Sequence, residues 1–194
     1  MTQSTELSGA DLLRGRVSVA KSKARSLFSF PNPVDDYAAR VVAGIVVALC
    51  AATIVLGQGW LLIPLAYGFW ARVLTGPRLS PAGLFATRIA APRLAGRFGP
   101  ARLVPGPPKR FAQGIGVAFS TTALMLWFVG GLHTEALVAT GLLATAAFLE
   151  SAFALCLGCT AFSLLMKIGL VPEEVCAECA DITKRVTERA EAAA

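Results

Sequence analysis

Residues 38–74 read AARVVAGIVVALCAATIVLGQGWLLIPLAYGFWARVL, and this stretch decides the fold class. A bilayer core of about 30 Å is spanned by about 20 apolar residues in a helix, and fewer suffice where Trp, Tyr or Arg side chains reach the interface. The runs 38–56 and 60–74 meet these conditions. Only the turn GQG separates them, so they are predicted to form a hairpin of two transmembrane helices.

The composition agrees with a membrane protein. Of the 194 residues, 55% are hydrophobic and 15% are charged, and the mean hydropathy is +0.64, whereas soluble domains have about 25% charged residues. The net charge of +6 would suit a nucleic-acid-binding protein if the basic residues formed one patch or stripe. They lie between apolar runs instead, so the lipid bilayer is an expected partner and nucleic acid is not.

Two further apolar runs predict a second hairpin. The third span is expected over 113–132, behind GPPKRF, whose prolines suit the first turn of a helix. The fourth begins at Thr134 or Glu135 and stays apolar to Ile168. At about 1.5 Å per residue this run is about 51 Å long, so it either projects from the membrane or breaks, and Gly158 is the expected break. The predicted fold is all-α, with four transmembrane helices in two hairpins.

The distribution of charge predicts the orientation. From Arg72 to Arg110 the chain has eight basic residues and no acidic one, whereas the turns after the first and third spans have no Lys or Arg. Because basic loops favour the cytoplasm, we expect a protein of the cytoplasmic (inner) membrane with both termini inside. The expected domains are a cytoplasmic arm over 1–33, a four-span membrane domain over 34–168 and a cytoplasmic helix over 169–194.

Part of the basic loop is expected to form an amphipathic helix. Leu79, Leu84, Ile89 and Leu94 recur near helical spacing, with arginines between them. Such a segment would lie on the anionic inner leaflet. Its basic side chains either form an anion-binding surface or serve only to set the topology.

Four of the five cysteines form two C-x-x-C pairs, Cys156 with Cys159 and Cys176 with Cys179. Structural disulfides are unexpected on a cytosolic face, because that compartment is reducing. A reversible dithiol fits better, in which one thiolate attacks a partner's disulfide or persulfide and the second thiol resolves the product. We expect Cys156 and Cys159 to be the reactive pair, Cys176 and Cys179 to be a relay or resolving pair, and no cofactor to be needed.

A metal centre is the alternative for the same four cysteines, because zinc ribbons use a similar spacing. Zinc or an iron–sulfur cluster would need all four sulfurs to meet. The first pair lies in an apolar run that is predicted to be helical, so the chain would have to bend at Gly158 or Gly169. A third possibility is that the cysteines only pack.

Glu150 is predicted to lie in the inner half of the fourth span, where an unpaired carboxylate is costly. It is therefore a candidate functional residue, unless it only forms a structural hydrogen bond with Thr121, Thr122 or a backbone carbonyl. On a continuous helix Glu150 and Cys156 lie about 240° apart and do not share a face. Activation of a thiol requires a helix N-terminus or a nearby cation, which the sequence offers only through Lys167 and the basic loop.

Five segments together resemble a known family: VDDYAARVVAGIV, TGPRLSP, PGPPKRFAQGIG, LESAFALCLGC and LVPEEVCAECADI. They are similar to the signature blocks of a bacterial membrane family, domain of unknown function number four-three-nine-five, over about residues 33 to 183. The resemblance implies a four-span membrane protein, and actinobacterial members similar to this chain carry the second C-x-x-C pair. It also implies an association with thioredoxin-like and sulfurtransferase proteins.

The resemblance places Lys109, Arg110 and Gln113 together in the third block. A sulfur oxyanion such as thiosulfate or sulfite could be held there by the two cations, by the amide of Gln113 and by the helix N-terminus. The function expected is thiol redox or persulfide transfer with a soluble thioredoxin-like or sulfurtransferase partner. The alternatives are a metal-binding module that binds or transports a small anion, and a non-catalytic membrane scaffold.

Overall fold

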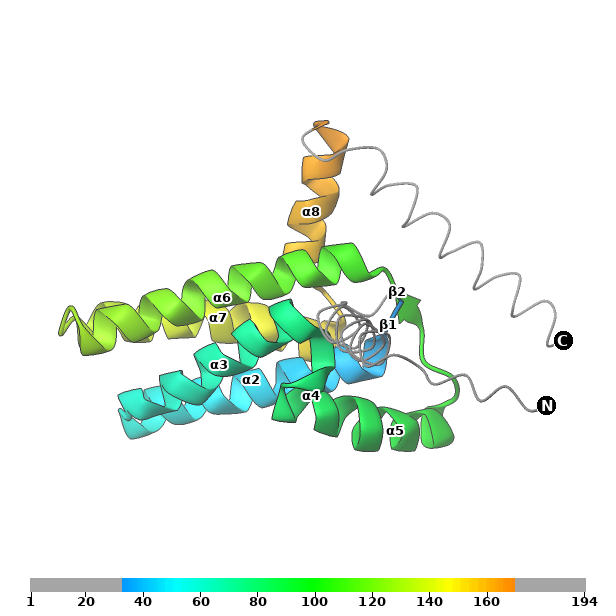
Figure 1. Ribbon diagram of the computed structural model, residues 1–194, viewed down its shortest axis with the longest axis horizontal. Coiled ribbons are helices and arrows are strands. Elements are labelled where there is room, and N and C mark those ends of the chain that lie inside the picture. Colours follow the sequence, from blue (N-terminus) through cyan, green and yellow to red (C-terminus); the bar gives the residue numbers. More distant parts are fainter. Residues whose placement is uncertain (1–32, 170–194) are drawn as a thin grey trace, which may run out of the picture.

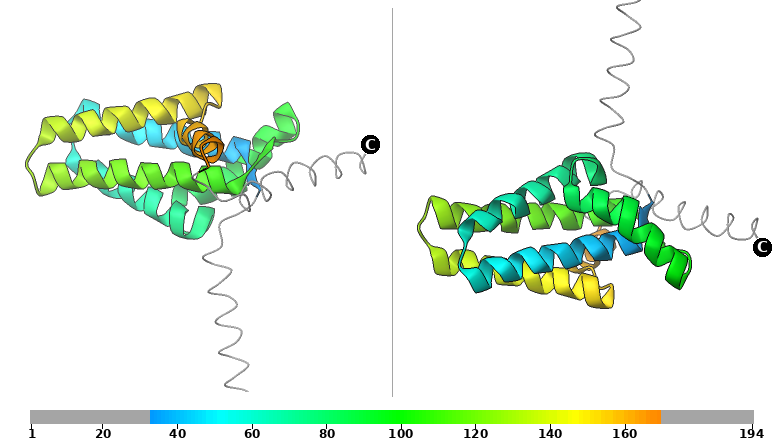
Figure 2. Two further views of the ribbon diagram at one scale, coloured as in Figure 1. Left: turned by 90° about the horizontal axis from the view of Figure 1, so that it is seen from above. Right: turned by 90° about the horizontal axis from the view of Figure 1, so that it is seen from below.

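The computed structural model describes residues 33–169, which form a bundle of two helical hairpins (Figure 1). The first hairpin consists of α2 (Asp36–Leu56) and α3 (Leu62–Thr75), and the second of α6 (Gly106–Phe128) and α7 (His133–Phe153). Helix α2 packs on α7, α3 packs on α6, and α6 packs on α7 (Figure 2). The predicted arm and the predicted C-terminal helix with Cys176 and Cys179 lie outside the described residues.

The prediction of an all-α protein with helices of membrane-spanning length and composition is confirmed. Three described helices, α2, α6 and α7, are long and apolar enough to cross a membrane. The second predicted span is divided into a short turn, η1 (Gly59–Leu61), and the 14-residue helix α3. Within residues 33–169 the only strands are β1 (Val34–Asp35) and β2 (Leu103–Val104), which pair antiparallel.

Local sequence explains both ends of α2. The Asp35 carboxylate accepts a hydrogen bond from the Ala38 amide at 3.1 Å and so caps the N-terminus. At the other end Gly57 adopts a left-handed conformation with φ of 60°, which glycine reaches without steric cost. The β1–β2 pair then holds the start of α2 beside the start of α6 (Figure 1).

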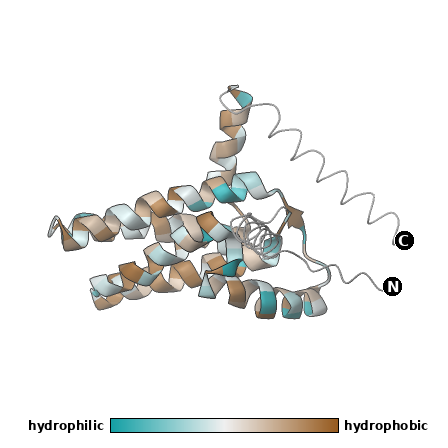
Figure 3. Ribbon diagram, in the orientation of Figure 1, coloured by the Kyte–Doolittle hydropathy of each residue, from teal (hydrophilic) through white to brown (hydrophobic). Residues whose placement is uncertain are grey.

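Apolar side chains fill the bundle and also cover its outside. The buried core takes residues from all four long helices: Val46, Cys50, Leu62, Leu65, Phe69, Ala123, Leu143 and Ala147. On the outer faces large apolar side chains are exposed, among them Trp60, Ile63, Trp70, Met125, Val138 and Phe148. Figure 3 shows hydrophobic residues along each of the long helices. An apolar exterior of this extent is typical of a surface that meets lipid.

The segment between the hairpins is helical, as predicted, and it rests against α2 through small residues; its contact with the inner leaflet stays a prediction. It contains η2 (Gly76–Arg78), α4 (Pro81–Phe85), the π-helical turn η3 (Ala86–Ala90) and α5 (Ala91–Phe98). Ala86 and Ala91 are buried against Ala38 and Val42 of α2, whereas Ile89 is 41% exposed. Small residues form the contact because they let the two helices approach closely.

The fourth apolar run breaks, but the predicted break at Gly158 is wrong. Helix α7 ends at Phe153, Ala154 takes a left-handed conformation with φ of 58°, and α8 (Leu157–Lys167) begins three residues later. The Arg40 guanidinium of α2 donates to the carbonyls of Ser151 and Ala152 at 3.0 and 3.1 Å. The last carbonyls of a helix have no hydrogen-bond donor within the helix, and Arg40 supplies one. Its positive charge also interacts favourably with the negative end of the helix dipole. Helix α8 begins beside α6 and then points away from the bundle rather than running along it (Figures 1 and 2).

The two ends of the bundle differ in charge. The loops 57–58 and 129–132 lie at the same end, shown at the left of Figure 1, and carry no Lys or Arg. The opposite end holds α4, the arginine-bearing segments η2, η3 and α5, the starts of α2 and α6, and α8 (Figures 1 and 3). The two hairpins therefore point in the same direction, and the first C-x-x-C pair lies at the basic end.

Candidate functional site

The break between α7 and α8 places Cys156 and Cys159 at a helix N-terminus. Cys156 has extended backbone geometry and is the N-cap of α8, and its Sγ accepts a hydrogen bond from the Cys159 amide at 3.3 Å. The Cys159 thiol also donates to Cys156 Sγ, with 2.7 Å between the sulfurs. Both cysteines are free, with Cys156 buried and Cys159 half-buried. The expectation that the pair is embedded in a continuous apolar helix is therefore wrong.

This geometry shifts the pKa values of the two thiols in opposite directions. The hydrogen bond from Cys159 lowers the pKa of Cys156, and it outweighs burial, which acts in the opposite direction. The amide hydrogen bond and the charge of Lys109 lower it further, while Glu150 opposes them. The same S–H···S contact raises the pKa of Cys159, together with burial. Cys156 is thus the thiol that ionises first.

An ion pair lies beside the cysteines. Lys109 Nζ of α6 donates to Glu150 Oε1 of α7 at 2.6 Å, and the two side chains are 9% and 16% exposed. The alternative that Glu150 bonds to Thr121 or Thr122 is wrong, because its partner is Lys109. Since α7 ends before Cys156, Glu150 and Cys156 line one cavity of about 400 Å³, although their sequence spacing predicts different faces.

Lys109 connects this ion pair to a second cavity on the cysteine side. That cavity, of about 420 Å³, is lined by Lys109, Cys156 and Cys159 together with Ser163 and Asp36. A cation near a thiolate stabilises the charged form. Lys109 belongs to the basic loop that the sequence offers as a source of charge for the thiols, and the structure identifies it as the member of that loop that lies beside both cysteines.

Gly158 is required by packing rather than by a chain break. A Cβ at this position would lie 2.5 Å from Ala112 Cβ and 2.6 Å from Ala112 Cα. The first turn of α8 therefore rests directly on α6. Further along, the rings of Phe111 and Phe162 continue the contact, with 5.4 Å between their centroids. The glycine of the C-L-G-C motif thus lies at the point where α8 contacts α6 and where a side chain would not fit.

Arg72 is a further buried polar residue at this end of the bundle. From the sequence alone it is counted only among the basic residues that predict the orientation. It lies in α3, is 6% exposed, and donates from Nε to Gln113 Oε1 at 2.8 Å. Nη1 reaches Ser80 Oγ at 3.4 Å, and the guanidinium lies 4.5 Å from the centre of the Phe69 ring. A basic residue inside an apolar run, three positions before the end of α3, is the sequence signal for such a site.

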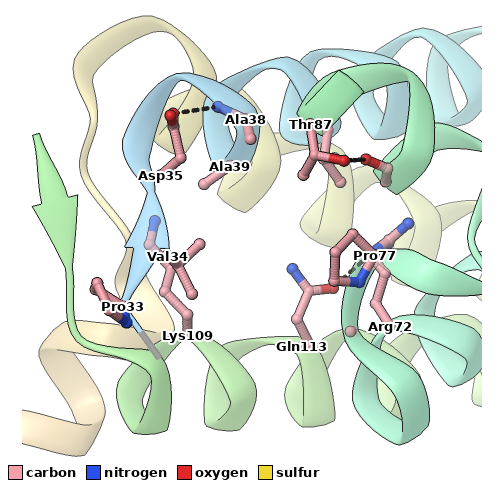
Figure 4. A pocket seen from close by; sticks show the side chains of 13 residues that line it. Pro33, Val34, Asp35, Ala38, Ala39, Arg72, Pro77, Thr87, Lys109 and Gln113 are labelled. Atoms are coloured by element: carbon pink, nitrogen blue, oxygen red, sulfur yellow. Dashed lines mark hydrogen bonds between the residues drawn. The ribbon is translucent and has the colours of Figure 1, made fainter. Parts of the chain in front are cut away.

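The three residues predicted to bind an anion divide into two groups. Lys109 and Gln113 are one helical turn apart and line a third cavity, of about 240 Å³, together with Arg72 (Figure 4). Arg110 is exposed and does not line this cavity. Cys176 and Cys179 lie outside the described residues, so the four-sulfur arrangement stays a prediction. Within residues 33–169 no group of three or more His, Cys, Asp or Glu side chains could hold a metal ion.

The family model described as domain of unknown function DUF4395 matches residues 34–167. The chain belongs to this family. The match contains the ion pair, Arg72 and the first C-x-x-C pair, and it ends before Cys176 and Cys179. The resemblance inferred from the sequence blocks is confirmed. No curated protein and no solved structure matches the chain.

The contact between Gly158 and Ala112 predicts a rescue experiment. Gly158→Ala should lower the free energy of unfolding by about 1–3 kcal/mol, because the added methyl overlaps α6, although alanine is otherwise better than glycine in a helix by about 0.5–1 kcal/mol. Chemical denaturation of the protein in detergent micelles measures the change. Ala112→Gly should restore part of the loss in the double variant, and an additive double variant would contradict the contact.

The S–H···S hydrogen bond predicts a shift in the pH dependence of Cys156. Cys159→Ala removes the thiol donor, so the pKa of Cys156 should rise and its alkylation by iodoacetamide should begin at higher pH. Cys159→Ser keeps a donor and should shift the profile less. Both variants are compared in a Cys176→Ser, Cys179→Ser background, so that the second pair does not contribute to the alkylation. The other remaining cysteine, Cys50, is buried. Equal profiles for the alanine and serine variants would show that the thiol hydrogen bond does not set the acidity.

Proposed function

We propose that the protein performs thiol redox or persulfide transfer with a soluble partner, and that Cys156 is the attacking group. The observation that carries this proposal is the position of Cys156 at the N-cap of α8, with its sulfur 2.7 Å from Cys159 Sγ. A helix N-terminus and a neighbouring cation are the two features that activate cysteines in proteins. Cys156 has both, the second through Lys109.

The redox reaction would proceed by two exchanges. Cys156 thiolate attacks one sulfur of a partner disulfide, that S–S bond breaks, and the first partner thiolate leaves. Cys159 then gives up its proton and attacks Cys156 Sγ, which releases the second partner thiolate and forms the Cys156–Cys159 disulfide. Two electrons pass to the partner. The elevated pKa of Cys159 keeps it protonated until Cys156 has reacted.

Persulfide transfer would use the same pair. Cys156 thiolate attacks the terminal sulfur of a partner persulfide, the partner thiolate leaves, and the transferred sulfur remains on Cys156. Attack by Cys159 on Cys156 Sγ would then release hydrosulfide and form the disulfide. Thioredoxin-like and sulfurtransferase proteins are the partner classes with such groups. Cys176 and Cys179 are proposed as a relay or resolving pair.

The membrane arrangement proposed here has four spans with both termini in the cytoplasm. Helix α3 with η1 runs beside α2 and α6 (Figure 2), and aromatic residues near its ends suit the interfaces. The basic residues gather at the end where α8 lies, which the positive-inside rule assigns to the cytoplasm. Helix α8 would then lie in the plane of the inner membrane surface, with the cysteines within reach of soluble proteins.

Redox titration with thiol trapping tests the proposed chemistry. The full chain in native membranes is equilibrated with dithiothreitol buffers of graded potential, then labelled with a maleimide that changes its mobility on a gel. A Cys176→Ser, Cys179→Ser variant should still form one disulfide. Because this is a two-electron transition, the ratio of oxidised to reduced protein should change tenfold for each change of about 30 mV in potential. Cys156→Ser in that background should abolish it.

Two outcomes would contradict the dithiol. One is that Cys156 and Cys159 stay reduced at every potential and never carry a persulfide. The other is that anaerobically purified wild-type protein holds about one zinc ion or iron–sulfur cluster that the Cys156→Ser variant lacks, since a closed thiolate site would use the same sulfurs. If all four C-x-x-C cysteines can be replaced without loss of function, the scaffold alternative is favoured.

Labelling from each side of the membrane tests the orientation. Single cysteines at Gln58 and Gly131, in a chain whose own cysteines are replaced by serine, should react with a membrane-impermeant maleimide added outside spheroplasts. A single cysteine at Arg93 should react only after the membrane is opened, because the basic loop is assigned to the cytoplasm. The opposite pattern would reverse the topology and place the thiol pair on the outer side of the membrane, away from cytosolic partners.

A further inference from the structure

Cys156 lies on the wall of two cavities that differ in character. The cavity of about 420 Å³ at the basic end also contains Cys159, Lys109 and Ser163. The cavity of about 400 Å³ between α6, α7 and α8, which we call the apolar cavity, includes Cys156 but not Cys159. The residue that carries the proposed attacking thiolate therefore borders both a polar space at the end of the bundle and an apolar space between its helices.

The rim of the apolar cavity lies on the outer surface of the bundle. Leu142 of α7 and Leu157 of α8 line it and are 58% and 51% exposed, so in the proposed membrane arrangement the cavity opens toward lipid. Of the polar residues that the structure places on this wall, Glu150 is bound to Lys109, and Gln113 accepts a hydrogen bond through its side-chain oxygen. The thiol of Cys156 is the reactive group that this wall offers to a ligand from the bilayer.

A further cavity adjoins the apolar cavity along the same hairpin. It has a volume of about 590 Å³, its wall includes Ala118 of α6, and it shares Phe119 and Leu142 with the apolar cavity. It extends to Thr134 at the start of α7. From Thr134 to Glu150 the helix rises about 24 Å, at about 1.5 Å per residue. The two cavities together suit a ligand whose head lies beside Cys156 and whose long apolar tail follows α7.

We propose that the apolar cavity binds a lipid-soluble quinone, with its ring beside Cys156 and its tail in the adjoining cavity. Quinones dissolve in the bilayer and accept electrons from protein thiol pairs in bacterial membranes. The volume of the apolar cavity lies within the range of about 300–1,000 Å³ that is typical of small-molecule sites. This inference rests on the thiol chemistry proposed above and assigns an electron acceptor to the Cys156–Cys159 pair.

Oxidation of the pair transfers two electrons and two protons to the ring. Cys156 thiolate adds to a ring carbon, and an electron pair moves to a quinone oxygen. Cys159 then loses its proton and attacks Cys156 Sγ, so the disulfide forms and the sulfur–carbon bond breaks with its electron pair left on the ring. The ring takes up the Cys159 proton and one proton from water and leaves as the quinol. Because thiol–disulfide exchange is reversible, a dithiol of the soluble partner can then reduce the disulfide, in the reverse of the exchange described above.

Anaerobic reduction of a quinone by the pre-reduced protein tests the proposal. The full chain with Cys176→Ser and Cys179→Ser, in detergent micelles and freed of reductant, is mixed with decylubiquinone. Quinol is measured by absorbance, and the disulfide is measured by maleimide trapping. About one quinol and one disulfide should form per chain, because the transfer involves two electrons. Cys156→Ser in the same background should form neither product.

Three alanine-to-phenylalanine variants locate the quinone. Ala146→Phe fills the apolar cavity and should slow quinone reduction by about tenfold or more, because the added ring would overlap the quinone, while its dithiothreitol titration stays unchanged. Ala118→Phe, in the adjoining cavity, should raise KM for decylubiquinone but not for the same quinone without its tail. Ala51→Phe makes the same change on an exposed face of α2 and should behave as the unsubstituted chain does.

The outcomes separate this inference from the thiol chemistry on which it rests. If the pair forms its disulfide in dithiothreitol buffers but reduces no quinone, the quinone site is overturned, the thiol chemistry stands, and the cavity is left to acyl chains of the bilayer. Normal quinone reduction by both Ala146→Phe and Ala118→Phe would also overturn the site, as would an equal loss in Ala51→Phe. If the pair forms no disulfide at any potential, both proposals fail.

Discussion

Lys109 and Glu150 form their ion pair at 2.6 Å in a region where most neighbouring side chains are apolar. Either charge alone would be expensive there, because removal of one partner from a buried pair costs about 3–5 kcal/mol. The pair therefore fixes the register of α6 against α7 at the basic end of the bundle. The end of α7, the start of α8 and both cavities beside Lys109 depend on that register. The ion pair acts at this end together with the β1–β2 pair and the hydrogen bonds of Arg40 to the end of α7.

The sequence allowed the long helices to be predicted because their signal is local. Hydropathy alone marks 38–56 as a helix, and the structure places α2 at Asp36–Leu56. The break after Phe153 has no such signal, since Ala154 and Leu155 are ordinary residues for an apolar helix. It depends on tertiary contacts, namely Arg40 at the end of α7 and the close approach of Gly158 to Ala112. A glycine in a sequence predicts flexibility as readily as close packing, so Gly158 was assigned the wrong role.

The same distinction applies to the candidate site. Cys156, Cys159 and Glu150 could be selected from their residue types, because a C-x-x-C pair and a carboxylate in an apolar run are both unusual. Their relation could not be predicted, since the angle between Glu150 and Cys156 was calculated for a continuous helix. Arg72 was missed because its charge was counted with the topology-setting arginines. Its place inside an apolar run is a signal that this count ignored, and its hydrogen bonds to Gln113 and Ser80 distinguish it in the structure from the exposed Arg78 and Arg88.

The sulfur of Cys156 is also the atom that caps α8, because it accepts the Cys159 amide at 3.3 Å. Any group that forms a covalent bond to this sulfur changes its charge and its ability to accept that hydrogen bond. By thermodynamic linkage, the stability of the first turn of α8 and the affinity of the sulfur for its bonding partner must then alter each other to the same extent. The chemical state of one atom is in this way coupled to the conformation of a helix that points away from the bundle.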